Sequence, residues 1–102
     1  MTEFHSVLEA RLAVIEAMDG EIESARRRVA GAKEMLGDVL GFDRVRIILC
    51  DGFVAVAEGE VPQARRCLEE AEEIRSRFGA TDRSEVGQMA AQLRSALNDL
   101  ME

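Results

Sequence analysis

Two stretches of the chain, thirty-nine residues apart, carry nearly the same order of residue types. Residues 19–27 read DGEIESARR and residues 58–66 read EGEVPQARR, so that Gly20 matches Gly59, and 59 − 20 = 39. A repeat of this length is typical of stacked helices, because one unit cannot bury its apolar face alone. We therefore expect an all-α fold whose faces bind other chains.

The spacing of apolar residues divides the chain into five helices, with breaks at glycines. The predicted helices cover about residues 6–18, 22–40, 43–58, 61–78 and 82–101. Gly41 and Gly79 are the expected helix ends, Pro62 suits a first turn, and Asp82 with Glu85 has the form of a capping box. We expect one domain over residues 1–102, made of a first repeat at about 6–41, a second at about 43–79, and a capping helix.

Residues 45–57 fit a second interpretation. The turn Asp51-Gly52 lies between two runs rich in Val, Ile and Phe, which is also the pattern of a β-hairpin. Helix is favoured because this segment holds the place in the second repeat that residues 6–18 hold in the first. A lone hairpin would also need further strands for stability.

Composition limits the partners and the compartment. The net charge of −7 argues against nucleic acid and anionic membranes, and no apolar run approaches the ~18 residues of a membrane span. No secretory signal is visible at the start, so a cytoplasmic location is expected. Cys50 and Cys67 are expected to be buried free thiols, with one disulfide bridge as the alternative. Met18, Met35 and Met89 are expected to fill gaps in or near a core.

The two units resemble tetratricopeptide repeats, and the resemblance covers about residues 6–79. In the second unit Gly52 is followed by Ala64, Leu68 and Ala71 at the family's spacing of close helix approach, and Gly59 resembles its turn residue. The fifth predicted helix is similar to the solvating end helix of the family. The chain departs from the pattern in its period and in residue types, such as Asp51 where the family prefers leucine. The departures resemble the longer repeats of bacterial signalling ATPases and transcription regulators.

The resemblance implies a right-handed α-solenoid fragment whose concave face is lined by the first helix of each unit. Carried over by spacing, the partner-binding groove would contain Val7, Ala10, Val14, Ala17, Arg46, Leu49, Phe53 and Val56. Leu49 and Phe53, with Val14, are the expected anchors of a partner. The alternative is that the fifth helix folds over this face and makes it core.

No constellation of residues predicts catalysis, a cofactor or a metal. His5 is the only histidine, and the acidic run at residues 69–73 is expected to be a solvated helix face, as are the arginines at 26–28 and 65–66. We expect a non-enzymatic interaction module that binds a protein or peptide segment, or a second copy in a homodimer. The alternative is an effector-sensing or regulatory domain excised from a larger signalling ATPase or transcription regulator.

Overall fold

Helices make up almost all of the structure, a computed structural model that describes residues 2–37, 41–79 and 84–101. The five helices are α1 (Thr2–Met18), α2 (Ile22–Leu36), α3 (Phe42–Glu58), α4 (Val61–Arg77) and α5 (Glu85–Met101). The described residues contain no strand, so the predicted all-α class is confirmed. None of these helices is long and apolar enough to cross a membrane, as far as the described residues extend.

Three helix ends differ from the predictions by three or four residues. The first helix begins at Thr2 instead of at about residue 6. The second helix stops at Leu36, because Gly37 takes a positive φ of 63° while its N–H still bonds to the carbonyl of Lys33. Gly41, the predicted stop, instead precedes α3. The start of α5 is capped by Ser84, whose Oγ accepts a hydrogen bond from the N–H of Gly87 at 3.1 Å. Residues 38–40 of the predicted second helix, and Asp82 of the predicted capping box, lie outside the described residues.

The central helix α3 runs unbroken through the segment that also resembled a hairpin. Asp51 and Gly52 lie inside the helix and are buried. The reason is packing, since α3 contacts each of the four other helices and is buried on nearly every side. A helix that is apolar almost all round belongs in such a central place.

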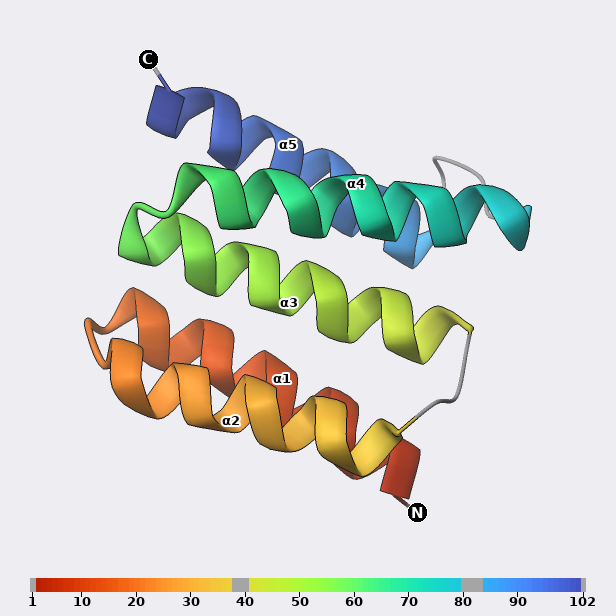
Figure 1. Cartoon of the computed structure of the whole chain (residues 1–102), viewed down its shortest axis with the longest axis horizontal. Helices are drawn as coiled ribbons and strands as arrows, with labels where there is room; N and C mark the ends of the chain where they lie inside the picture. Colours follow the sequence, from red (N-terminus) through yellow and green to blue (C-terminus); the bar gives the residue numbers. More distant parts are fainter. Residues whose placement is uncertain (1, 38–40, 80–83, 102) are drawn as a thin grey trace.

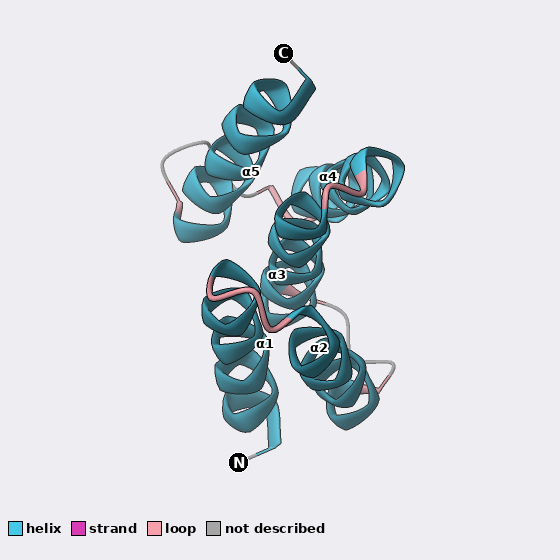
Figure 2. Ribbon diagram, turned by 90° about the vertical axis from the view of Figure 1, so that its left-hand side faces the viewer, coloured by secondary structure: helices cyan, strands magenta, loops and turns pink. Residues whose placement is uncertain are grey.

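Consecutive helices run antiparallel and pack as neighbours (Figure 1). The α1–α2 pair contacts α3, the α3–α4 pair is joined by a short turn at Gly59, and α5 packs on both α3 and α4. Figure 2 shows that α1 and α5 lie on one side of α3, whereas α2 and α4 lie on the other. Within the described residues the backbones of α1 and α5 do not touch, although both contact α3. On one side, α3 is therefore flanked by α1 and α5, which do not close over it.

Small residues allow the closest helix approaches. Gly52 of α3 faces both α4 and α5, and a Cβ added there would lie 2.5 Å from Leu93 Cδ2 and 3.2 Å from Cys67 Cβ. Ala64 and Ala71 of α4 are fully buried in the same layer. These positions bring the helix axes close enough for dense packing, and a larger side chain would push them apart.

Two of the three methionines expected in or near the core lie on the surface. Met18 and Met35 are both exposed, while Met89 is half-buried and packs against the core. Met18 is the last residue of α1 and is 78% exposed. Filling of the core is done instead by branched residues of α3 and α5, among them Ile47 and Leu93.

Candidate functional site

A groove about 350 Å³ in volume lies between α1 and α5, with α3 as its floor. We define the groove by its lining residues: Arg11 and Val14 of α1, Cys50 and Phe53 of α3, and Glu85, Gln88, Met89 and Gln92 of α5. The three helices come from the two repeats and the final helix, so the groove exists only in the assembled fold. It lies on the side of α3 where Figure 2 shows α1 and α5.

A second hollow is larger, at about 550 Å³, but it lies beside the turn between α1 and α2. It is lined only by residues 20–24 of that one turn. A binding site needs groups that converge from several directions. The groove meets that requirement and the hollow at the turn does not.

The groove combines an apolar floor with a polar rim. Val14, Phe53 and Met89 are half-buried, so each keeps part of its apolar surface open while its other side packs on the core. Gln92, on the α5 wall, is exposed and offers an amide that both donates and accepts hydrogen bonds. An apolar floor with a few polar groups at the edge is the anatomy of a protein-binding surface.

A network of ion pairs spans the rim from α1 to α5. Glu85 Oε1 accepts hydrogen bonds from Arg11 Nη2 at 2.6 Å and from Arg46 Nε at 2.9 Å, and Arg46 also contacts Asp43. The hydrogen bond from Arg46 is the main reason that the pKa of Glu85 lies below its ordinary value, and Arg11 acts in the same direction. Two positive and two negative charges therefore cancel at the rim.

The structure distributes the eight predicted groove residues over three environments. Val14 and Phe53 line the groove, and Arg46 reaches its rim through Glu85. Val7 and Val56 are half-buried against the core beside it. The remaining three are buried, namely Ala10, Ala17 and Leu49.

Leu49 is the main difference from the expected site. It is fully buried in a cluster with Val86, Ala90 and Leu93 of α5, so it does not lie on an open face. The fifth helix folds over this part of α3, as the alternative interpretation of the sequence allowed. Phe53 lies one helical turn further along α3 and stays at the edge of α5, where it remains part of the groove.

Sequence reasoning missed the α5 wall of the groove. Only one stripe of that helix was considered, the stripe that packs as a cap. The thirty-nine-residue period would have found the wall, since 89 − 50 = 39 and 92 − 53 = 39 relate Met89 to Cys50 and Gln92 to Phe53. The fifth helix thus follows the same period as α3, and its equivalent positions line the same side.

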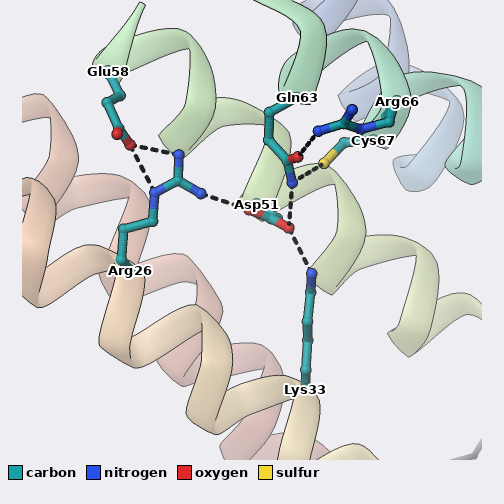
Figure 3. Close-up of polar contacts among 7 residues, drawn as sticks. All are labelled: Arg26, Lys33, Asp51, Glu58, Gln63, Arg66 and Cys67. Atoms are coloured by element: carbon teal, nitrogen blue, oxygen red, sulfur yellow. Dashed lines mark hydrogen bonds and ion pairs between the residues drawn. The ribbon is translucent and has the colours of Figure 1, made fainter. Parts of the chain in front are cut away.

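The opposite side of α3 carries a buried carboxylate, Asp51, with only 4% of its side chain exposed (Figure 3). Lys33 of α2 contacts its Oδ2 at 2.6 Å, and Arg26 of α2 lies 3.7 Å from its Oδ1. Gln63 of α4 donates to the same carboxylate at 3.5 Å. A buried charge is tolerated only when it is paired and hydrogen-bonded in this way.

The Asp51 cluster extends on both sides and ties three helices together. Arg26 also donates to Glu58 at 2.7 Å, and Gln63 accepts a hydrogen bond from Arg66 at 2.6 Å while lying 3.8 Å from Cys67 Sγ (Figure 3). In the part of the chain that the structure describes, no group of three His, Cys, Asp or Glu residues could hold a metal. The positive and amide groups around Asp51 instead fix how α2, α3 and α4 pack.

Both cysteines are free and buried, which agrees with the expected reduced thiols. Burial raises the pKa of Cys50 to about 11 and that of Cys67 to about 12, and the negative charge of Asp51 acts in the same direction. A thiol with such a pKa is almost wholly protonated at pH 8 and is therefore a poor nucleophile.

We expect neither thiol to react promptly with Ellman's reagent at pH 8 in the folded protein. Two thiols per chain should react within seconds once the protein is unfolded in guanidinium. Absorbance at 412 nm measures both phases. A rapid reaction of one or both thiols in native buffer would contradict the burial of these residues.

No protein-family model matches this chain, and comparisons with curated proteins and with solved structures found no significant match either.

Proposed function

We propose that this chain is a tetratricopeptide-like interaction module, without enzymatic activity, that binds a helical segment of another protein in the groove. The apolar floor formed by Val14, Phe53 and Met89 carries the proposal. These residues come from three different helices and leave part of their apolar surface open along one trough. A contiguous apolar patch with a polar rim is typical of an interaction site.

A helix suits this groove better than an extended strand. An extended peptide gains most of its affinity by adding to the exposed edge of a sheet, and the described residues contain no sheet. An amphipathic helix instead lays its apolar side chains, three and four residues apart, into a hydrophobic trough. The walls formed by α1 and α5 would then flank the incoming helix on both sides.

The ion pairs at the rim favour a protein segment over a small charged effector. Arg11 and Arg46 are already matched by Glu85 and Asp43, and no buried side-chain polar atom of the described residues lacks a hydrogen-bond partner. Sites for small polar ligands instead present several converging polar groups, whose hydrogen bonds the ligand completes. The regulatory alternative, in which this module belongs to a signalling ATPase or transcription regulator, remains compatible with binding a helix.

The test starts from a displayed library of amphipathic helical peptides, selected against the wild-type chain. We expect Phe53→Ala to weaken the selected peptides about 30-fold, which corresponds to the ~2 kcal/mol of an aromatic hot spot. Gln92→Arg, an exposed substitution on the α5 wall, should weaken them as well without disturbing the core. Fluorescence anisotropy with labelled peptides gives the dissociation constants.

The matched control is Phe42→Ala. Phe42 is an exposed aromatic residue that pairs edge-on with Phe78 at a ring distance of 6.1 Å and does not line the groove. Its substitution should leave peptide binding unchanged. The proposal would be rejected if the peptides bound the Phe53→Ala and Gln92→Arg variants as tightly as the wild type but bound the Phe42→Ala variant more weakly. The binding surface would then lie outside the groove.

A further inference from the structure

The side of α1 that faces away from the core carries an apolar stripe. Leu8, Leu12, Ile15 and Met18 follow one another at intervals of three and four residues, so they share one face of the helix. Leu8 is 45% exposed, Ile15 57% and Met18 78%, while Leu12 is half-buried. We call these four residues the α1 stripe. It is separate from the groove, which Val14 lines on an adjoining side of the same helix.

The stripe occupies positions that serve for helix packing elsewhere in the chain. Steps of thirty-nine residues give the series Leu8–Ile47–Val86 and Ile15–Val54–Leu93. In α3 both members are buried against the α1–α2 pair, and in α5 both are buried among core residues of the chain. Only in α1 are they exposed. The stripe therefore has the residue pattern of a helix-packing face. Among the described residues, no helix pair covers it.

The surroundings of the stripe suit a second copy of this acidic chain. Between Leu8 and Met18, α1 carries three charged residues, and each is already paired. Glu9 and Glu16 both contact Arg28, and Arg11 contacts Glu85. Two chains that each carry a net charge of −7 repel one another, so they can approach closely only through a surface whose charges are balanced. The α1 stripe provides such a surface.

The other end of the molecule does not match the stripe. The exposed residues of α5 that do not line the groove include Ala91, Ser95, Asn98 and Asp99, three of which are polar. Contact of the stripe of one copy with this side of the next would remove the Asn98 amide and the Asp99 carboxylate from water. Contact of stripe with stripe avoids that cost. Such a contact uses the same patch on both copies and closes after two.

We propose that this chain forms a twofold dimer in which the α1 stripes of two copies pack against each other. A stripe of this size exposes a few hundred Å², the range of the largest apolar patch on an ordinary monomer. A stable complex buries about 800 Å² on each partner. The dimer is therefore expected to be weak and to dissociate in the micromolar range. The proposal does not rest on peptide binding in the groove.

The experiment is sedimentation equilibrium of the whole chain from about 1 to about 200 μM. The weight-average mass is expected to rise from the 11.3 kDa of one chain toward twice that value and to stop there. Leu8→Glu combined with Ile15→Glu should abolish the rise, because it places charges in the stripe. Circular dichroism and thermal unfolding should remain unchanged in this variant, since both residues are exposed.

The control pair, Ala91→Glu with Ser95→Glu, adds the same charge to the exposed side of α5 and should leave the dimer intact. Three results would overturn the proposal. They are a single-chain mass at every concentration, growth beyond two chains, and equal loss of association in the control pair. Unfolding of the stripe variant would also overturn it, because these residues would then belong to the core. Binding of selected peptides in the groove should be unaffected by the stripe variant, so the two proposals can fail separately.

Discussion

Gly52→Leu is expected to lower the free energy of unfolding by about 3 kcal/mol, because it overpacks the place where α3, α4 and α5 meet. Even a single added carbon would lie 2.5 Å from Leu93 Cδ2 and 3.2 Å from Cys67 Cβ. The Leu93 side chain can turn aside, but Cβ of Cys67 is fixed to the backbone of α4, so α3 and α4 must move apart. Urea denaturation followed by circular dichroism measures the change.

The matched control is Gly31→Leu. Gly31 also lies inside a helix, but a Cβ added there meets nothing within 4 Å. Because leucine favours helix over glycine, this variant should be more stable than the wild type by up to about 1 kcal/mol. Opposite signs for the two variants are the expected result. A Gly52→Leu variant as stable as the wild type would show that the three helices do not approach so closely.

Lys33→Met is expected to destabilise the fold by about 3 kcal/mol, since it leaves the Asp51 carboxylate buried without its closest partner. This loss of stability is at the low end of the range for removing one partner of a buried ion pair. Arg26 remains 3.7 Å away and Gln63 still donates, and half of the Lys33 side chain is already in solvent. Chemical denaturation at neutral pH gives the loss.

Adding Asp51→Asn to Lys33→Met should recover part of the loss, because the amide carries no charge to leave buried. We expect a coupling of about 1–2 kcal/mol in the double-mutant cycle. Arg77→Met serves as a comparison, since Arg77 and Glu73 form an exposed pair with 70% and 65% of their side chains in solvent. That substitution should change stability by less than about 0.5 kcal/mol. Equal effects of Lys33→Met and Arg77→Met would mean that Asp51 is not buried as described.

The helices were predictable because periodicity and glycines act locally. The predicted helices α2 and α4 are confirmed with ends within a few residues, and the turn at Gly20 recurs at Gly59 as expected. The predicted end of α2 was wrong because Gly37 and Gly41 can both terminate a helix. Any glycine can adopt a positive φ at little cost in free energy, but the surrounding packing decides which of the two glycines does so.

The groove was predictable only in part, because α3 is apolar on nearly every side. Its sequence shows that Leu49 and Phe53 lie on a similar face, but not how far α5 reaches across that face. In the structure Leu49 is covered by α5 whereas Phe53 is not. Which of two neighbouring apolar residues stays open depends on the placement of another helix, and no local pattern of α3 contains that information.

The Asp51 cluster shows a different limit of sequence reasoning. The sequence analysis named Asp51 only in a possible hairpin turn and as a departure from the leucine of tetratricopeptide repeats. Its partner Lys33 lies eighteen residues earlier in another helix. A pairing across helices follows from the packing of α2 on α3, so it becomes visible only in the assembled fold.

The most direct test of the proposed function is to map a selected helical peptide onto the chain by nuclear magnetic resonance. Titration of the labelled protein should shift the amide signals of Val14, Phe53, Met89 and Gln92, which belong to three different helices, and leave those around the Asp51 cluster in place. Shifts confined to α2 and α4, on the opposite side of α3, would contradict the groove as the binding surface.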